Sequence, residues 1–232
     1  MQIRAIKTRI FRENEDLFSF VLKHVKNISE NSILVVTSKI VALAEGRTVP
    51  NFGPKERERL ILQESDWARK TNLVWLTRKD GMIMANAGVD ESNANGQLIL
   101  LPRNSFKSAE LLREKLVKHL KIKNLGVIIS DSALMPLRSG VVGGALGYAG
   151  FKGVRSYVGE RDIFKRKLEF SKTNIADSLA TAAVLCMGEG REQKPLALIT
   201  NAPVVFQNKI NQKELNINPA QDIYAPLFNK LN

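Results

Sequence analysis

The sequence has little of the side-chain chemistry that many enzymes use. In 232 residues there is one cysteine, Cys186, and there are two histidines, His24 and His119. A single cysteine excludes an intramolecular disulfide and a cysteine-cluster metal site, and we expect this thiol to be buried between Leu185 and Met187. No histidine or cysteine stands at metal-ligand spacing from either histidine, so we expect both histidines at helix surfaces.

Long apolar runs and common nucleotide-binding motifs are also missing. Runs such as 33–36 and 98–101 are far shorter than the roughly 20 residues of a membrane span. The N-terminus has no apolar signal core, so we expect a cytoplasmic protein without a membrane partner. The chain has neither the Gly-x-x-x-x-Gly-Lys-Ser/Thr loop nor the Gly-x-Gly-x-x-Gly fingerprint, which excludes the P-loop and Rossmann motifs.

Acidic residues are outnumbered by basic ones. The chain has 35 Lys and Arg against 23 Asp and Glu, a net charge of +12. Nucleic acid and small polyanions such as nucleotides are both suitable partners for such a protein. The basic residues are spread along the chain, as in 115–123, where the pattern favours a solvated helix face. Small anionic substrates are therefore favoured over nucleic acid.

The pattern of apolar residues predicts a mixture of helices and strands. Three- and four-residue spacing predicts helices over 13–28, 54–70, 105–120 and 171–187. Asn104 or Ser108 is the expected cap of the third helix. Short apolar runs predict strands at 33–37, 73–78, 82–86, 97–101, 125–130 and 195–200. Asp80-Gly81 predicts a hairpin between the second and third of these.

Hairpins without regular strand–helix alternation indicate the α+β class. We expect a mixed sheet with flanking helices, arranged in two lobes. The 232 residues suit one large or two small domains, and no linker or repeat divides them. We therefore treat 1–232 as a single catalytic module.

Polar residues gather in loops beside the predicted strands. The stretch 86–93 contains asparagines, acids and a glycine, a composition that a plain turn would also favour. Ser130-Asp131-Ser132 follows an apolar strand, where a carboxylate would project into a cleft and suit Mg²⁺ or Mn²⁺. Six of the 15 glycines lie in 140–153, where a ligand or a strand could approach closely. Gly188-Glu189-Gly190-Arg191 adds an acid beside a cation.

One of these loops carries a family resemblance. Asn86-Ala87-Gly88-Val89-Asp90-x-Ser92-Asn93 resembles the signature of the coenzyme F420:gamma-glutamyl ligase family. Further segments match in that family's order between about residues 30 and 200. They are Val35-Val36-Thr37-x-Lys39-Ile40-Val41 with Ala44-Glu45-Gly46-Arg47, Leu100-Leu101-Pro102, Ser108-Ala109, Val127-Ile128-Ile129-x-Asp131, Gly147-Tyr148-Ala149-Gly150, Tyr157-x-Gly159-Glu160-x-Asp162, and Ala176-Asp177-x-Leu179-Ala180-x-Ala182-Ala183 before Met187-Gly188.

The resemblance implies a GTP-dependent amide ligase that works as a homodimer with Mg²⁺ or Mn²⁺. In that family the carboxylate of an acceptor takes the γ-phosphate of GTP, and the amine of L-glutamate then displaces phosphate from the acyl phosphate. By position, Asp90 and Asp131 resemble the ligands of one metal ion, and Asp131 is the expected catalytic residue. Ser132 would serve a second ion, and Glu189 is a further expected ligand. The nucleotide contacts expected from the resemblance are Lys39, Asn93 and Gly188.

The chain also departs from the family's pattern. Ala42-Leu43 stands where the family has Ser-Lys, so a lysine that would meet nucleotide phosphate is missing, and GTP against ATP is left open. Of the family's Asp-Thr-x-Gly-Arg-x-Trp-Arg, the stretch 131–138 keeps only the Asp and the last Arg, and Thr200-Asn201 replaces Arg-Gly. The acceptor is therefore the F420 precursor or a related acid. Folate polyglutamylation and a non-catalytic basic binding protein are the alternatives.

Overall fold

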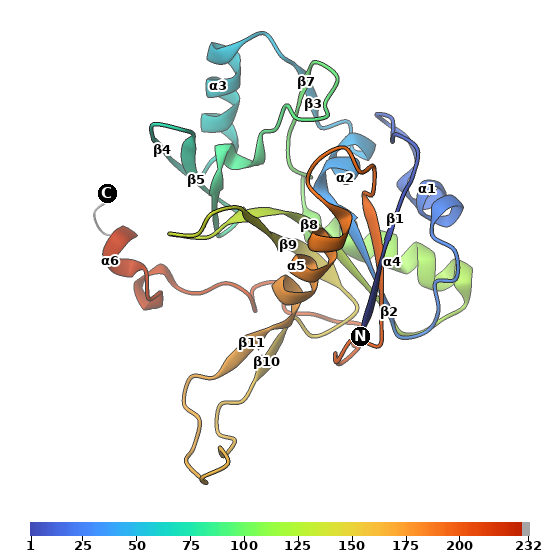
Figure 1. Cartoon of the computed structure of the whole chain (residues 1–232), viewed down its shortest axis with the longest axis vertical. Helices are drawn as coiled ribbons and strands as arrows, with labels where there is room; N and C mark the ends of the chain where they lie inside the picture. The colour runs from blue at the N-terminus through green and yellow to red at the C-terminus, as the bar shows by residue number, and fades with distance from the viewer. Residues whose placement is uncertain (229–232) are drawn as a thin grey trace.

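The computed structural model describes residues 1–228, and a five-stranded mixed sheet forms its centre (Figure 1). The last four residues of the predicted 1–232 module lie outside the described part. In spatial order the strands are β1 (Gln2–Ile6), β12 (Leu196–Thr200), β2 (Ser32–Thr37), β8 (Leu125–Leu134) and β9 (Val141–Ala149). The β2–β8 pair is parallel and the other pairs are antiparallel. The predicted α+β class is confirmed.

Both faces of this sheet are apolar. Successive residues of a strand point to opposite faces, so Leu34 and Val36 of β2 enter one apolar cluster and Ile33 and Val35 enter another. The first cluster includes residues of α1 (Leu17–His24), α2 (Ser38–Ala44) and α4 (Ser105–Leu120). The second includes residues of α5 (Ile175–Met187). Burial from both sides explains why the central strands are continuous apolar runs.

A smaller set of elements lies beside the main sheet, at the top of Figure 1. Its strands β4, β5 and β6 form an antiparallel sheet, and β3 pairs with β7. An apolar cluster that includes Leu60, Ile61 and Leu98 holds them against α3. The bounds are β3 (Thr48–Pro50), α3 (Pro54–Glu64), β4 (Trp67–Lys70), β5 (Trp75–Lys79), β6 (Met82–Ala85), the 3-10 helix η1 (Asn86–Gly88) and β7 (Gln97–Ile99).

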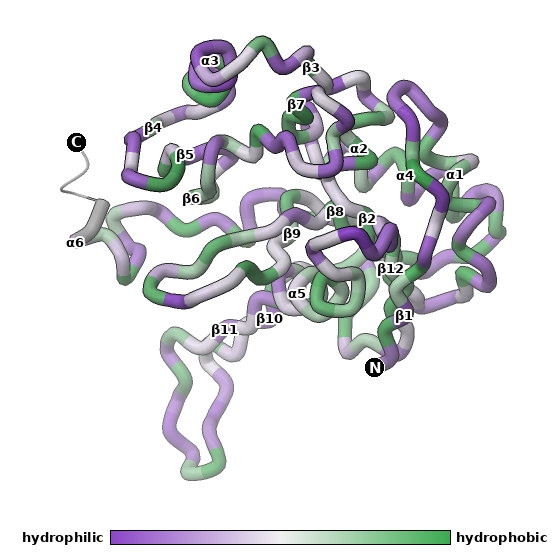
Figure 2. Tube along the Cα trace, turned by 45° about the horizontal axis from the view of Figure 1, so that its top comes forward, coloured by the Kyte–Doolittle hydropathy of each residue, from purple (hydrophilic) through white to green (hydrophobic). Residues whose placement is uncertain are grey.

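A two-stranded arm projects from the body of the molecule (Figures 1 and 2). It consists of β10 (Val154–Ser156), β11 (Lys172–Asn174) and the segment between them. Three large apolar side chains of this segment are almost fully exposed: Ile163 at 90%, Phe164 at 84% and Phe170 at 87%. After β12 the chain forms the 3-10 helix η2 (Pro219–Gln221) and α6 (Ala225–Phe228). No helix within residues 1–228 has the length and apolar character to cross a membrane.

Most predicted elements are confirmed, and three helices begin or end at other residues. The helix over 105–120 is present as predicted, and the Asn104 side chain caps it by accepting a hydrogen bond from the Lys107 amide at 2.9 Å. The helix predicted over 54–70 ends at Glu64, because 67–70 pairs with β5. The one predicted over 171–187 begins at Ile175, because 172–174 pairs with β10. The helix predicted over 13–28 is shorter, Leu17–His24.

The prediction of a buried Cys186 is wrong. Helix α5 turns Ala183, Val184 and Met187 toward the sheet, and Cys186 lies on its exposed side. Neighbours in sequence are about 100° apart around a helix, so apolar flanking residues do not ensure burial. The expectation for the histidines is confirmed: His119 is exposed, and the half-buried His24 bonds through Nδ1 to the Phe20 carbonyl oxygen at 2.8 Å.

Glu64, the last residue of α3, joins the smaller elements to the chain leaving α2. Its carboxylate bonds to Arg47 at 2.8 Å and to Lys79 of β5, and all three side chains are less than 20% exposed. Burial raises the pKa of Glu64, but hydrogen bonds from Lys79 and Arg47 outweigh this and hold it below its ordinary value of 4.5. The ionised carboxylate therefore stabilises the fold.

Replacing Glu64 by Gln should lower the free energy of unfolding at pH 7 by about 1–3 kcal/mol, because it leaves two half-satisfied buried cations. The pKa of Glu64 is lower in the folded than in the unfolded protein. The extra stability of wild type over the variant should therefore be complete above pH 4.5 and should shrink as the pH falls through the pKa of the folded state. Urea unfolding from pH 3 to pH 7 measures it. The exposed pair Lys107–Glu110 supplies the control, Glu110→Gln, expected to change stability by less than about 0.5 kcal/mol. Equal losses in the two variants would contradict the assignment.

Candidate functional site

The central parallel pair brings two polar segments to one edge of the sheet. β2 ends at Thr37, opposite Ser130 of β8, and α2 begins at the next residue, Ser38. The strand predicted to end at Ser130 instead continues to Leu134 in a hairpin with β9, with a bulge between Ile129 and Ser130. A bulge redirects the side chains that follow it. Beyond it, the Asp131 carboxylate accepts a hydrogen bond from the Ser38 hydroxyl at 2.9 Å.

The loop that follows η1 supplies the second wall. Asp90 is held in place by main-chain hydrogen bonds with Ile99 in both directions. Its carboxylate forms an ion pair with Lys39 of α2 at 2.8 Å and accepts from the Ser92 amide and hydroxyl, each at 2.8 Å. The Lys39 ammonium also donates to the Ser92 carbonyl oxygen at 2.6 Å. Residues 39 and 90–92, far apart in sequence, thus form one polar network.

The third wall is the loop from α5 to β12. The Ser132 hydroxyl donates to the Glu189 carboxylate at 2.7 Å, and the Asn93 amide reaches the Gly190 carbonyl oxygen at 3.5 Å. The Thr37 amide donates to the Pro195 carbonyl oxygen at 3.0 Å, which fastens the loop to the end of β2. The loop therefore closes over the edge where Asp131 lies.

These walls enclose a cleft of about 510 Å³. All of the residues that the sequence singled out line it, namely Lys39, Asp90, Asn93, Asp131, Ser132, Gly188 and Glu189. The cleft also includes residues to which the sequence assigned no role in the site: Ser38, Ser92, Ser130 and the segment Thr8–Phe11. The serines stand in short, common sequence patterns. The position of the N-terminal segment depends on the pairing of β1 with β12, which lies near the other end of the chain.

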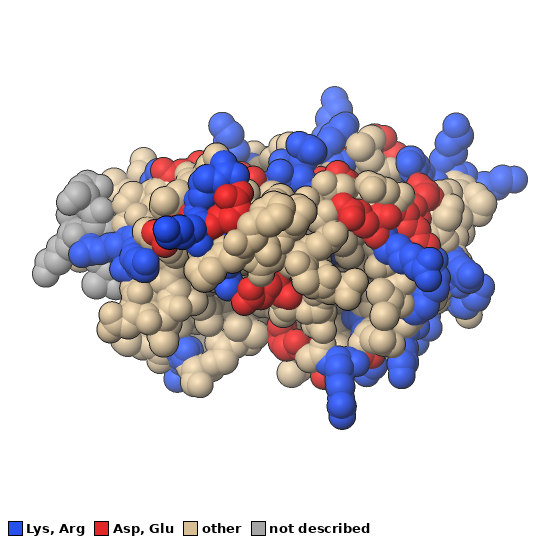
Figure 3. Space-filling view, turned by 90° about the horizontal axis from the view of Figure 1, so that it is seen from above, with Lys and Arg blue, Asp and Glu red and all other residues tan. Residues whose placement is uncertain are grey.

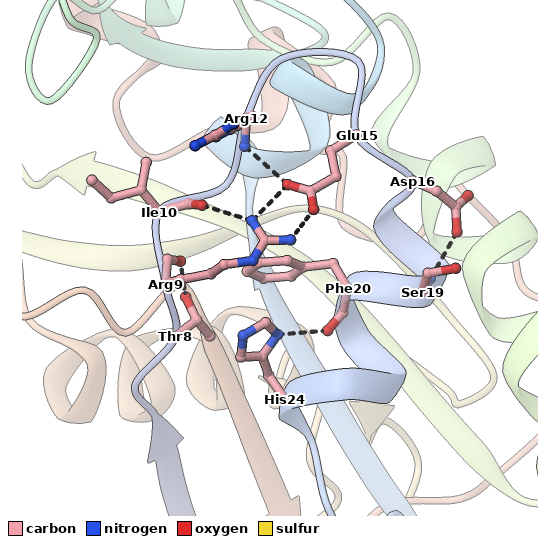
Figure 4. A network of polar contacts seen from close by, with 9 residues as sticks. All are labelled: Thr8, Arg9, Ile10, Arg12, Glu15, Asp16, Ser19, Phe20 and His24. Carbon is pink, nitrogen blue, oxygen red and sulfur yellow. Dashed lines mark hydrogen bonds and ion pairs between the residues drawn. The ribbon is translucent and has the colours of Figure 1, made fainter.

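The segment Thr8–Phe11 lines the cleft, and polar contacts hold it in place, several of which Figure 4 shows. The Arg9 guanidinium lies over the Phe20 ring, forms an ion pair with Glu15 and donates to the Ile10 carbonyl oxygen at 2.9 Å. The Thr8 amide donates to the Gln193 carbonyl oxygen at 2.9 Å, so the segment is tied to the loop after α5. The N-terminal segment and this loop thus form one continuous rim.

The two aspartates of the cleft differ in their electrostatics. Burial raises the pKa of Asp131 to about 6, against the Ser38 and Ser132 hydrogen bonds, and the negative charge of Asp90 adds to the rise. Burial also raises the pKa of Asp90, but Lys39 and the Ser92 amide outweigh it and bring the pKa below its usual value. Asp131 is therefore the carboxylate with the larger unmet demand for positive charge.

A second cleft, of about 480 Å³, lies between α3 and the β4–β5 turn. Its two cationic residues are already engaged, Arg57 with Glu91 at 2.9 Å and Lys70 with Glu58 at 3.4 Å. Its charged lining is thus neutral in sum. Of the two clefts, the one at the sheet edge has both the predicted residues and the unequal aspartates.

The molecular surface shows how the +12 charge is distributed. Seen from above, Lys and Arg side chains project around the outline, and Asp and Glu lie between them (Figure 3). On this face the basic residues form no continuous stripe along which a nucleic-acid backbone could run.

Known proteins match most of this chain. The model of the F420-0:gamma-glutamyl ligase family matches residues 5–201. The chain belongs to this family. It is similar to the coenzyme F420:L-glutamate ligases of two Methanococcus maripaludis strains, with 33% identity over 97% of both chains for C7 and 37% identity over 91% of this chain and 86% of the relative for S2. The corresponding ligase of Methanocaldococcus jannaschii is 32% identical over 90% of each chain.

The range matched by the family model includes every residue that lines the cleft. The matched range begins at residue 5, ahead of the quoted segments, and therefore includes the rim segment Thr8–Phe11 as well as the loop after α5. The structure also places the departures from the family's pattern. Leu43 lines the cleft, whereas Met135 and Leu137 lie exposed at the tip of the β8–β9 hairpin.

Two glycines of β9 set the distance between the sheet and its helices. A Cβ atom on Gly143 would stand 2.5 Å from the Ala180 carbonyl oxygen of α5, and one on Gly147 would stand 2.4 Å from the Phe106 amide nitrogen of α4. The glycine-rich stretch predicted to allow close approach thus does so for helix backbones. Because α5 leads directly into the loop with Gly188, its distance from the sheet positions the third wall of the cleft.

Gly143→Ala should push α5 away from β9 and lower the free energy of unfolding by about 1–3 kcal/mol. Gly144→Ala is a matched control, because the nearest atom to its Cβ would be Ala133 Cβ at 3.4 Å, an ordinary contact. Urea unfolding of both variants against wild type measures the difference. A Gly143→Ala variant as stable as Gly144→Ala would show that α5 does not depend on this contact.

Proposed function

We propose that the protein is a GTP-dependent amide ligase, and that the cleft of about 510 Å³ is its active site. Its acceptor is the coenzyme F420 precursor or a related carboxylic acid, and the group it adds is L-glutamate. Family membership and the names of the relatives support the reaction class. The observation that carries the proposal for the site is the convergence of Lys39, Asp90, Asp131 and Glu189 from four separate parts of the chain on one cleft.

In the proposed reaction, a carboxylate oxygen of the acceptor attacks the terminal phosphorus of GTP, and GDP leaves. The amine nitrogen of glutamate then attacks the acyl carbon, inorganic phosphate leaves with the bonding electrons, and the nitrogen proton passes to solvent. The substrates are anions, so the site must balance negative charge. Lys39 neutralises Asp90 and holds Asp90 and Ser92 in one arrangement, while Ser38 orients the Asp131 carboxylate.

The oxygen atoms of the cleft fit Mg²⁺ or Mn²⁺. The Ser130 hydroxyl, which also lines the cleft, is buried without a hydrogen-bond partner in the described part of the chain, as expected where a bound group is missing. Within residues 1–228 no three His, Cys, Asp or Glu side chains are placed to hold an ion together. Magnesium sites commonly use one or two carboxylates plus substrate phosphates, so this is no obstacle.

The residues proposed to hold the ions are Asp90, Asp131, Ser132 and Glu189, and those proposed to contact the nucleotide are Lys39, Asn93 and Gly188. A bound divalent ion would neutralise phosphate charge and favour in-line transfer. The raised pKa of Asp131 fits this proposal, because a nearby cation would compensate the buried charge.

Asp131→Ala should abolish product formation, with a loss of at least about 100-fold, because no other described carboxylate occupies its position in the cleft. The assay contains Mn²⁺, labelled glutamate and either GTP or ATP, with the F420 precursor and a folate as separate acceptors. Glu114→Ala, an exposed α4 residue, is the control and should keep wild-type activity.

Product with the folate alone would replace the acceptor named above, and product with ATP alone would replace the nucleotide. No glutamyl product with any combination, together with nucleic-acid binding that weakens steeply with salt, would overturn the ligase proposal in favour of a basic binding protein.

We further propose that the protein is a homodimer assembled through the β10–β11 arm. The exposed Ile163, Phe164 and Phe170 side chains support this, because a two-stranded hairpin is marginal by itself and such apolar exposure is uncommon on a monomer. A second copy offers the same arm in return, which gives a closed symmetric pair.

Sedimentation analysis should give wild type twice the 25.9 kDa mass of one chain. The double variant Ile163→Asp, Phe164→Asp should sediment with the mass of one chain, because two charges replace the apolar contact. Leu73→Asp, at an equally exposed apolar residue outside the arm, should remain a dimer. A dimeric double variant would exclude the arm as the interface.

A further inference from the structure

The cleft has four cationic side chains, Arg9, Lys39, Arg191 and Lys194, and two of them are already neutralised. Lys39 forms its ion pair with Asp90, and Arg9 forms one with Glu15 (Figure 4). Neither Arg191 nor Lys194 forms an ion pair with any carboxylate of residues 1–228. These two are therefore the cationic side chains of the cleft that form no ion pair with a described carboxylate.

Lys194 is the more enclosed of the two. Its residue is half-buried in the cleft wall, whereas Arg191 is exposed. Lys194 directly precedes Pro195, whose carbonyl oxygen accepts from the Thr37 amide, so its backbone is fixed against the end of β2. A lysine that lies in a cleft wall without an acidic partner can donate to a bound anion.

The Ser130 hydroxyl lies on the side of Thr37 away from Pro195. Ser130 pairs with Thr37 in the β2–β8 ladder, so Ser130 and Pro195 flank Thr37 on its two neighbouring strands. Ser130 is 0% exposed, and its hydroxyl has no hydrogen-bond partner among residues 1–228. A cation and a hydroxyl donor without described partners therefore line the same cleft. Phosphate oxygens accept from both kinds of donor.

The wall of the cleft formed by α2 offers no cation that is without an ion pair among residues 1–228. Helix α2 contributes Ile40 and Leu43 to the cleft, and its one cation there, Lys39, is engaged by Asp90. A nucleotide phosphate chain that enters the cleft would thus meet a cation without an ion pair at Lys194.

We propose that Lys194, together with the Ser130 hydroxyl, binds the phosphate chain of the nucleoside triphosphate and replaces a lysine absent from α2. This inference rests on the proposed function, since it assigns a role in the nucleotide site of that cleft. Lys194 is then a nucleotide-binding residue at the start of β12.

Calorimetric titration of purified protein with GTP, GDP and guanosine, in Mn²⁺ and without acceptor, tests the proposal. Lys194→Gln should weaken GTP and GDP binding by about 10- to 100-fold and leave guanosine binding unchanged, because only the phosphates lose a partner. Lys194→Arg should retain most of the affinity. Lys118→Gln, the same loss of charge at an exposed α4 residue, should bind like wild type.

A second variant separates lost charge from lost fold. Adding Leu43→Lys to Lys194→Gln places a cation on the opposite wall of the same cleft and should restore at least part of the GTP affinity. Unchanged GTP affinity in Lys194→Gln would overturn this inference while the ligase proposal stands. So would an equal loss for guanosine. Wild-type protein that binds no nucleotide and forms no glutamyl product would overturn the proposed function itself.

Discussion

The parallel pairing of β2 with β8 is the constraint on which the rest of the site depends. Both strands are covered by apolar side chains on both faces, so their register is strongly specified, and their last pair is Thr37 with Ser130. Everything polar begins just beyond that pair, with Ser38 on one strand's exit and Asp131 on the other. A slip of one residue would turn Asp131 to the opposite face and break its hydrogen bond to Ser38.

Charge compensation determines how the cleft is divided. Lys39 neutralises Asp90, and Glu15 neutralises Arg9, so these groups hold the walls in place. Within residues 1–228, neither Asp131 nor Lys194 forms an ion pair. The described part of the cleft thus keeps charges of both signs without ion pairs, an arrangement that costs stability in the free protein.

Local features of the fold could be predicted from sequence, and features set by distant pairing could not. Asn104 caps α4 through its own loop, so the pattern there was sufficient. Trp67 and Ala68 continue the apolar spacing of α3, yet they pair with β5, and Cys186 faces outward although both its neighbours are apolar. For the site, the family resemblance assigned roles to Asp90 and Asp131 and assigned none to Ser130 or Lys194. The roles proposed for these two depend on partners that they lack within residues 1–228, which no sequence pattern reveals.

The pairing of β1 with β12 has a consequence for how the newly synthesised chain folds. Gln2 lies opposite Thr200, and the rim of the cleft joins the Thr8 amide to the Gln193 carbonyl oxygen. A nascent chain on the ribosome cannot make either contact until nearly 200 residues have left the exit tunnel. The cleft is therefore among the last parts of the molecule to form, and a chain truncated before β12 lacks one of its walls.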